Sequence, residues 1–482
     1  MDYQKIFNFI PEVRSPEEKK LDFKTKSKFT LIILFLFFIL SNIPLFGLSS
    51  NALERFEYLA IILGTDFGSI ISLGIGPIVM GSIILQLLTG AGILNINTST
   101  IEGKRLFQGL QKLLVFFFII FESIVYVAMK GLEATPGLGG IVILQLILGG
   151  LAIFYMDELC QKWGFGSGVS IFIAAGVSLR LFTSAFGFIN SQSQNCLFNF
   201  NSVACPGKVF FLIQSLINPD YGVNQFLIVL FTLIATVLIF LIVVWAQSLK
   251  VEIPLSFGRL RGYGIKWPLQ FFYASVIPVI FTAALMANLQ LFGSLFQNAA
   301  APCVSEAGVC TLGPKIASYF SSILGTFSGN TPISGLAFWI GSSNLIEIFV
   351  NIGFSWKHVL QGVTHILFYA FFATLFSIFW VKTSGIDSKA QAQKISNSGL
   401  QVAGFRQDNR ILESILDRYI MPLTVMGGIA IGVLAAATDL LGALVSGTAM
   451  LLVIMIMFQL YQSIAEQHAS DMNPMMKKFI GK

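Results

Sequence analysis

Residues 226–245 have the sequence FLIVLFTLIATVLIFLIVVW, which is 20 positions long and holds no charged side chain. A transmembrane helix needs about 20 consecutive apolar residues, so this stretch alone predicts one membrane span. The 482-residue chain has the same character throughout, because 55% of its residues are hydrophobic and only 11% are charged. A typical soluble domain has about 25% charged residues, and no soluble core of this size buries so much apolar surface. We therefore expect the lipid bilayer to surround most of the chain.

Further apolar runs of spanning length lie on both sides of this stretch. Together they number ten and cover, with soft boundaries, residues 29–48, 70–94, 107–130, 138–158, 167–189, 224–247, 269–293, 357–382, 419–438 and 441–464. If the N-terminus is cytoplasmic, 24 of the 30 Lys and Arg residues fall in cytoplasmic segments. The exceptions are Arg180, in or near the membrane, and the external residues Arg55, Lys130, Lys208, Lys315 and Lys357. The positive-inside rule thus predicts ten helices with both termini cytoplasmic, and the charged start of the chain predicts no cleavable signal peptide.

The ten runs divide evenly about the loop at 190–223, with five before it and five after it. An odd number of spans in each half means that the two halves enter the membrane in opposite orientations, as in an inverted repeat. We therefore predict an N-terminal half at 1–189, an external hinge loop at 190–223 and a C-terminal half at 224–482. Secondary transporters share this arithmetic, so a small-solute transporter is the alternative interpretation.

Residues 49–77 interrupt the regular pattern. Their apolar part, Leu53–Leu63, is too short to span a bilayer. It is followed by helix breakers, namely Gly64, Gly68, Gly74, Gly76 and Pro77. Broken backbone at membrane depth is tolerated only where protein buries it or where it lines a cavity. We expect this segment to face an internal cavity; an external loop with a surface helix is the alternative.

The five cysteines and three histidines give no metal-binding pattern. Cys160 lies at the cytoplasmic end of a predicted helix, and the others form two pairs in external loops, Cys196 with Cys205 and Cys303 with Cys310. Either pair could form a disulfide in an oxidising exterior, but spacing alone does not decide it. The chain also contains no HExxH, GxSxG or nucleotide-binding motif. We predict that it is not an enzyme and that it holds no cofactor or metal.

A series of short motifs occurs in order along both halves. The motifs are Ile10–Val13, Leu73–Val79, Leu106–Gly109, Gly166–Gly168, Val251–Leu255 with Gly258 and Arg259, Gly404–Arg406, Arg418–Ile420, and Gly442 and Ala443 with Gly447 and Thr448. This ordered set resembles the SecY family of protein-conducting channels, and its archaeal form more than its bacterial form. Ile43–Gly47 also resembles the eukaryotic endoplasmic-reticulum homologue. The resemblance covers almost the whole chain.

The resemblance implies an all-α membrane protein in which two inverted five-helix halves surround a central, hourglass-shaped pore. By motif position, the ring of aliphatic side chains that closes the pore consists of Ile75, Val79, Val169, Ile173, Ile280 and Leu452. A narrow apolar constriction resists wetting and ions, which suits this role. Residues 49–69 would form a plug beside the ring, with Leu59, Ile61 and Ile62 on its apolar side. Without the resemblance, ordinary helix packing would explain the six ring residues.

The resemblance also implies a lateral gate toward lipid. Polar residues within apolar helices occupy the family's gate positions at Glu122 and Asn288, and Gln86 is a further candidate. A carboxyl group in hydrocarbon is costly, so we expect Glu122 to be partnered or protonated. Asn288 could donate a hydrogen bond that closes the gate. Plain interhelical hydrogen bonding is the alternative role for these side chains.

Two long, basic cytoplasmic loops, 248–268 and 383–418, correspond to the ribosome-binding loops of the family. Their candidate ribosome contacts are Arg259, Arg261 and Arg406. A guanidinium group binds phosphate with two hydrogen bonds, which suits ribosomal RNA. The alternative is that these arginines only reflect the positive-inside rule.

The function implied by the resemblance is that of the central channel subunit of a Sec translocon. Such a channel moves unfolded secretory polypeptides across the membrane and releases transmembrane segments laterally into lipid. The implied partners are a SecE-like subunit and a small beta-type subunit in a heterotrimer, the translating ribosome, signal sequences, nascent chains and the bilayer. The implied location is the cell membrane, or the endoplasmic-reticulum membrane in a eukaryote. Arg180 and the enlarged external loop at 294–356 have no role in this scheme.

Overall fold

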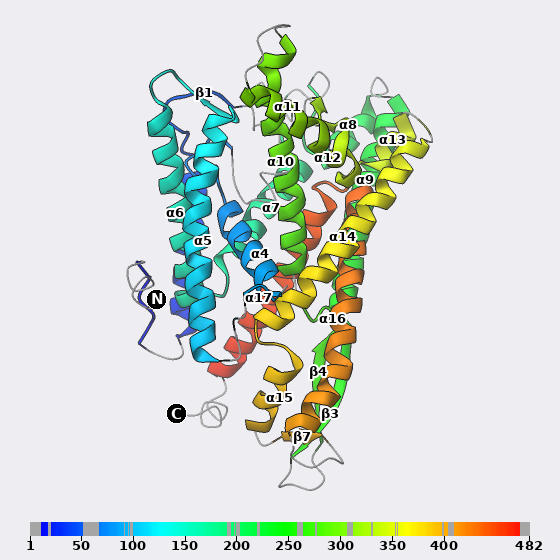
Figure 1. The fold of residues 1–482 in the computed structure, drawn as a ribbon. Coiled ribbons are helices and arrows are strands. Elements are labelled where there is room, and N and C mark those ends of the chain that lie inside the picture. Colours follow the sequence, from blue (N-terminus) through cyan, green and yellow to red (C-terminus); the bar gives the residue numbers. More distant parts are fainter. Residues whose placement is uncertain are drawn as a thin grey trace.

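The structure is a computed structural model. It describes residues 11–17, 21–51, 67–90, 92–94, 96, 100–189, 194–196, 198, 203–218, 222–257, 264–274, 277–305, 312–328, 331–351, 353, 355–397, 400–402 and 409–472. Each of the ten predicted apolar runs overlaps one of ten helices, although several helices begin or end at other residues than predicted (Figure 1). These helices are α2 (Phe23–Ser41), α4 (Gly76–Gly90), α5 (Ile101–Ala128), α6 (Gly139–Trp163), α7 (Gly168–Phe186), α9 (Gly222–Ser248), α10 (Ile277–Ser305), α14 (Trp356–Thr383), α16 (Asn409–Leu440) and α17 (Gly447–Met472). The predicted all-helical membrane fold is confirmed.

Eight of the described helices are long and apolar enough to cross a membrane on their own. The two others among the ten are α2, whose first turns carry three lysines, and α4, which has only 15 residues. The predicted run at 70–94 is therefore too long for its helix. Residues 67–75 form turns instead, because Gly74 has a φ of +54° and Pro77 fits only the first turn of a helix. The helix begins at Gly76, inside the protein.

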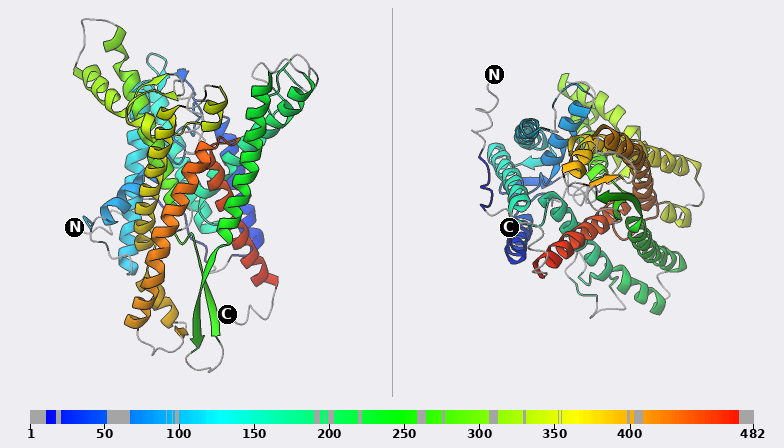
Figure 2. Two further views of the ribbon diagram at one scale, coloured as in Figure 1. Left: turned by 90° about the vertical axis from the view of Figure 1, so that its right-hand side faces the viewer. Right: turned by 90° about the horizontal axis from the view of Figure 1, so that it is seen from below.

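The helices pack within each half and also across the boundary between the halves (Figure 2). Contacts across the boundary join α7 to α17, α2 to α17, α4 to α10 and α4 to α14. Burial differs sharply between helices, since 78% of the apolar window of α10 is buried but only 28% of that of α9. α10 therefore lies at the centre, whereas α9 presents leucine, isoleucine and phenylalanine side chains outward, as a lipid-facing helix does.

One end of the helix bundle carries several short elements, shown at the top of Figure 1. They are β1 (Leu48–Asn51), β2 (Leu132–Ala134), α8 (Lys208–Ile217), α11 (Leu312–Leu324), β5 (Phe327–Ser328), β6 (Thr331–Pro332), α12 (Gly335–Ile340) and α13 (Leu345–Asn351). β1 and β2 form one antiparallel pair, and β5 and β6 form another. The enlarged loop at 294–356 thus folds into short helices and a small hairpin between α10 and α14.

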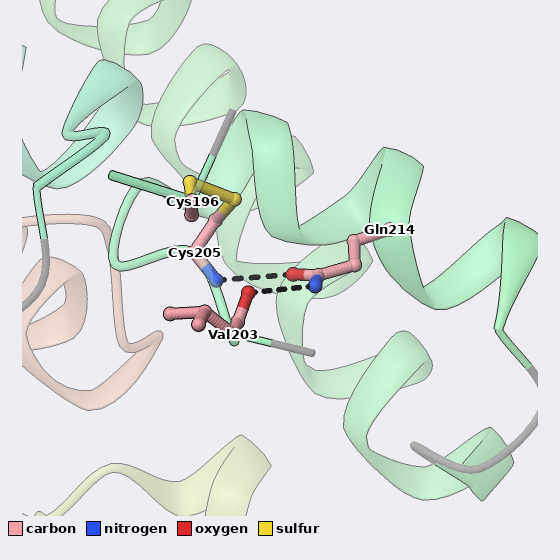
Figure 3. Close-up of a disulfide and its surroundings, with 4 residues drawn as sticks. All are labelled: Cys196, Val203, Cys205 and Gln214. Atoms are coloured by element: carbon pink, nitrogen blue, oxygen red, sulfur yellow. Dashed lines mark hydrogen bonds between the residues drawn. A yellow bond between two sulfur atoms is a disulfide. The ribbon is translucent and has the colours of Figure 1, made fainter. Parts of the chain in front are cut away.

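The loop between the halves contains a disulfide bond between Cys196 and Cys205 (Figure 3). The buried side chain of Gln214, on α8, holds the same loop. Its Oε1 accepts a hydrogen bond from the Cys205 N–H at 3.0 Å, and its Nε2 donates to the Val203 carbonyl at 2.9 Å. One of the two disulfides left open by the sequence is therefore present. The other pair, Cys303 and Cys310, lies outside the residues whose side chains are described.

The opposite end carries a three-stranded antiparallel sheet that hydropathy does not predict. Strand β3 (Lys250–Phe257) lies between β4 (Gly264–Gln270) and β7 (Leu400–Val402), so the sheet joins the two long basic loops. A short helix, α15 (Ser388–Asn397), precedes β7, and α16 begins at Asn409, ten residues before the predicted start at 419.

The base of this sheet is tied to the neighbouring helices. The Phe271 N–H donates to the Leu249 carbonyl at 3.0 Å, and Gln270 Nε2 donates to Gln462 Oε1 of α17 at 3.3 Å. The Tyr273 hydroxyl donates to the Ile386 carbonyl at 2.6 Å. Burial raises the pKa of Tyr273 to about 12, so this hydroxyl stays protonated and keeps its donor role.

Candidate pore and lateral gate

The six predicted ring residues lie at the starts of four helices. Ile75 directly precedes α4, and Val79 lies in its first turn; Val169 and Ile173 lie in the first two turns of α7; Ile280 and Leu452 lie near the starts of α10 and α17. All but Val169 are at most 3% exposed. These five belong to one hydrophobic core cluster that includes residues of both halves, and Val169 packs against it. The structure therefore brings the predicted ring residues into one apolar region between the halves.

The turn before α4 shows how the chain places Ile75 at this depth. The backbone bends at Ser69–Gly76, with hydrogen bonds from Gly74 N to Ile71 O at 2.8 Å and from Gly76 N to Leu73 O at 3.2 Å. The Ser72 hydroxyl accepts from the Gly68 N–H at 2.8 Å and is fully buried. The broken backbone thus lies inside protein, as its composition predicts.

A cavity of about 590 Å³ opens on one side of this apolar region. Val79, Val169 and Ile280 are part of its wall, so three ring residues border it. Much of the remaining wall is polar and comes from α4, α5, α6, α7 and the end of α14: Ser82, Gln86, Lys104, Gln108, Gln111, Asp157, Gln161, Ser167, Ser170, Thr383 and Ser384. Polar and apolar side chains therefore share the wall of this cavity, and its apolar part includes three of the predicted ring residues.

The three predicted gate residues are buried in adjoining helices. Gln86 lies on α4, Glu122 on α5 and Asn288 on α10, and each is at most 3% exposed. Gln86 reaches the cavity wall. Asn288 Nδ2 donates to the Ala284 carbonyl of its own helix at 2.8 Å, and Oε1 of Gln86 and of Glu122 has no hydrogen-bond partner among the described residues. Gln86 and Asn288 lie on α4 and α10, which contact each other across the two halves, and Glu122 lies on α5, which packs against α4; all three stay gate candidates.

A contact between the ends of α4 and α14 was not predicted from the sequence. Gly90, the last residue of α4, lies directly against the ring of Phe379 on α14, so even a Cβ there would overlap the ring. On the same side, the ammonium group of Lys104 on α5 approaches Gly385, just beyond the end of α14. The two halves therefore meet closely on the cavity side of the gate. No motif signalled these residues, because their importance depends on which helices become neighbours.

An ion-pair network fixes the N-terminal segment to the same half. Lys112 on α5 and Lys162 on α6 each bridge Glu12 and Glu158, with Lys112 2.7 Å from Glu158 and Lys162 2.8 Å from Glu12. The hydrogen bond from Lys162 is the largest cause that lowers the pKa of Glu12 below its ordinary value. Trp163 Nε1 also donates to the Arg14 carbonyl at 2.9 Å. The segment 11–17 is thus held against α5 and α6.

Six predicted site residues lie outside the described residues. They are the plug residues Leu59, Ile61 and Ile62 and the candidate ribosome contacts Arg259, Arg261 and Arg406. The described chain resumes on either side of them: β3 and β4 flank Arg259 and Arg261, and β7 precedes Arg406. Their roles stay predictions.

Comparison with known proteins gives the family. A family model named SecY matches residues 69–461, and a second model, the plug domain of Sec61p, matches residues 35–68. The chain belongs to the SecY family. The protein translocase subunit SecY of Methanothermobacter thermautotrophicus is 38% identical over 99% of this chain and 98% of its own length. That of Methanocaldococcus jannaschii is 34% identical over 99% of both chains.

Solved structures agree with this assignment. A structure described as that of a protein-conducting channel has a TM-score of 0.79 at 32% identity and covers 97% of this chain and 98% of its own. Sec61 in the canine ribosome-channel complex from the endoplasmic reticulum has a TM-score of 0.76 at 32% identity, with the same coverage. The predicted resemblance to archaeal SecY is confirmed. The prediction that the chain is not an enzyme agrees with the family, whose matched members are channel subunits.

Proposed function

We infer that this SecY-family chain is the central channel subunit of a Sec translocon. In this role it moves unfolded polypeptides across the membrane and releases transmembrane segments sideways into lipid. The observation that carries the inference is the cavity that polar side chains of several helices line together with the apolar side chains of Val79, Val169 and Ile280, which come from both halves. A secondary transporter would instead place several ionisable groups near the middle of the membrane for substrate and coupling ions.

The ring explains how one structure can both seal and conduct. Ile75, Val79, Ile173, Ile280 and Leu452 are buried and belong to one hydrophobic core, so a ring built from them would present only hydrocarbon to water and ions. Aliphatic side chains offer no hydrogen bonds or charges, so a passing polypeptide slides past them without being held. The ring residues come from four separate helices of both halves, so a small separation of the halves widens the opening.

The gate explains the second exit. α4 of one half contacts α10 and α14 of the other half, and α5 packs beside α4. A segment in the cavity that is apolar enough gains free energy by moving between these helices into lipid. Gln86, Glu122 and Asn288 lie in this contact and would adjust its strength, because buried polar groups in a helix interface favour arrangements that give them partners.

The proposed partners and orientation follow from the same scheme. The partners are a SecE-like subunit, a small beta-type subunit, signal sequences, nascent chains and the translating ribosome, which would contact Arg259, Arg261 and Arg406. Both termini would face the cytoplasm. The disulfide between Cys196 and Cys205 supports an external position for the loop at 190–223, because disulfides persist in oxidising compartments.

Site-specific crosslinking tests the proposed function. Ile280 is replaced by a photoreactive residue, and the channel is engaged by a ribosome-bound secretory chain that is stalled in translation. We expect an adduct with the nascent chain that requires a functional signal sequence. The matched control is the same photoreactive residue at Ile234, a lipid-exposed position on α9, which should give no such adduct. Absence of adducts from Ile280, Val79 and Ile173 alike, with membrane insertion verified, would favour small-solute transport.

A further inference from the structure

Two buried aspartates occupy the same place in the two halves of the channel. Asp157 lies near the end of α6, the fourth long helix of the N-terminal half, and Asp439 lies at the end of α16, the fourth long helix of the C-terminal half. They are 5% and 7% exposed. Each directs its carboxylate at the start of the following helix, α7 or α17. Those two helices carry three of the six ring residues, namely Val169, Ile173 and Leu452.

The hydrogen bonds are equivalent in the two halves. Asp157 Oδ1 accepts from the backbone N–H of Val169 at 3.0 Å, and Asp439 Oδ1 accepts from the backbone N–H of Thr448 at 2.7 Å. A nearby hydroxyl also donates to each carboxylate, from Ser167 in the first half and from Thr448 itself in the second. Gln161 Nε2 donates to the other oxygen of Asp157 at 2.8 Å.

The carboxylate of Asp157 supplies the N-terminal cap that the side chains at the start of α7 do not provide. The first N–H groups of any helix lack partners within the helix, and an N-cap side chain usually accepts one of them. Ser167 stands at the N-cap of α7 but makes no side-chain cap hydrogen bond. A negative charge beside a helix N-terminus is favourable as well. Asp157 thus caps α7 from a neighbouring helix.

A glycine allows each helix start to approach its aspartate. A Cβ at Gly168 would lie 2.7 Å from the Cα of Asp157, and a Cβ at Gly447 would overlap the backbone of Thr438 and Asp439. Both contacts are with backbone, which cannot move aside as a flexible side chain does. The starts of α7 and α17 are therefore fixed by contact as well as by the hydrogen bonds.

We propose that Asp157 and Asp439 are positioning residues that hold the ring-bearing helices α7 and α17 at the depth where their side chains seal the pore. Val169 is itself a ring residue whose N–H is bound by Asp157, and Ile173 lies one helical turn beyond it. Leu452 lies one turn beyond Thr448. The inference rests on the proposed role of the ring. The new part of the inference is that one carboxylate in each half sets the depth of the ring side chains along the pore.

Asp439, the aspartate of the C-terminal half, has an additional contact with α14. His365 Nε2 on α14 lies 3.5 Å from Asp439 Oδ2, and His365 Nδ1 lies 2.6 Å from the Ile340 carbonyl of α12. Since a carbonyl oxygen only accepts, Nδ1 carries a proton. Asp439 therefore connects α17 with α14, whereas Asp157 bonds to side chains of α6 and of the residue preceding α7.

The test is the ion leak of the resting channel, measured per channel in vesicles that contain the complete purified complex. Asp157→Ala and Asp439→Ala should each raise the leak about fivefold, the ratio that the usual loss of a helix cap gives. Asp157→Asn and Asp439→Asn should stay within about twofold of the wild type, because an amide oxygen still accepts the backbone N–H. Asp417→Ala is the matched control, because Asp417 is an exposed carboxylate of α16 that bonds only to Ser388 in its described contacts.

If the two aspartates have only a structural role, the Ala variants will lower the yield of complex without changing the leak per channel. That result would overturn the proposal. An equal leak from the Ala and Asn variants would also overturn it. If the Ala variants do not assemble, Gly168→Ala provides the same test, since it keeps the carboxylate but pushes α7 away; an unchanged leak would contradict the proposal. Ile280→Ser separates the two levels of inference. If it does not raise the leak, the ring itself is wrong; if it does while the aspartate variants do not, only the positioning role fails.

Discussion

Removal of the disulfide between Cys196 and Cys205 should loosen the loop between α7 and α9 by a calculable amount. The two cysteines are nine residues apart. Closing a loop of that length restricts the open state enough to contribute about 2.5 kcal/mol at 25 °C in the chain-entropy model. The change can be made by reductant or by the double variant Cys196→Ser, Cys205→Ser.

Amide hydrogen exchange measures this loosening directly. The Cys205 N–H is bound to Gln214 and the Cys196 N–H to the Phe188 carbonyl, at 3.0 and 2.9 Å. A loss of about 2.5 kcal/mol corresponds to roughly 70-fold faster exchange of these two amides. The Thr135 N–H, bound to the Gly47 carbonyl at 2.8 Å in another external loop, should be unaffected.

The refuting result is equally definite. If both amides exchange within about threefold of their oxidised rates after reduction, the hydrogen bonds of Gln214 hold the loop and the chain-entropy argument fails here. Equal acceleration of the Thr135 amide would instead show a global loss of stability, and would refute the claim that the disulfide acts locally.

Three further outcomes are expected. Because the pKa of Glu12 is lowered in the folded protein, its ion pairs stabilise the segment 11–17 fully above the ordinary carboxylate pKa. This stabilisation is lost as the pH falls through the lowered pKa. Amide exchange at Val13 should show that pH dependence, and Glu12→Gln should abolish it. Asn288→Leu removes a buried amide from the gate and stabilises its closed form, so a more apolar segment should be needed for lateral release in a membrane-insertion assay; an unchanged threshold would remove Asn288 from the gate. Gly90→Val should force Phe379 away and weaken the contact between α4 and α14, seen as reduced crosslinking of cysteines placed across that contact. Gly140→Val on α6, with helical backbone and no atom near its Cβ position, should leave it unchanged.

The sequence predicted the membrane helices well because the bilayer imposes a length and a composition on each of them. It was less successful where other forces act. The start of α4 was missed because Gly74 and Pro77 stop the helix inside an apolar run. The start of α16 was missed because its first turns, from Asn409, extend beyond the apolar run and carry polar side chains that hydropathy does not register.

In the site, too, features set by the local sequence were predicted and features set by helix packing were not. The ring residues were predicted from motifs, and the structure places five of them in its large hydrophobic core with Val169 packed against it, so their role stays a prediction. The partners of Asp157 and Asp439 could not be predicted, because each hydrogen bond joins residues whose proximity depends on how two helices meet. The sheet of β3, β4 and β7 was not predicted either, since β3 and β7 lie more than a hundred positions apart in the sequence.

That sheet has a mechanical consequence. β4 is seven residues long, so the paired strands project about 24 Å from the helices, and β7 binds them to the segment that leads into α16. The hydrogen bonds of Phe271, Tyr273 and Gln270 anchor its root to three different neighbours. A force on the strands is therefore transmitted to Leu249 after α9, to Ile386 after α14 and to α17, which all belong to the C-terminal half.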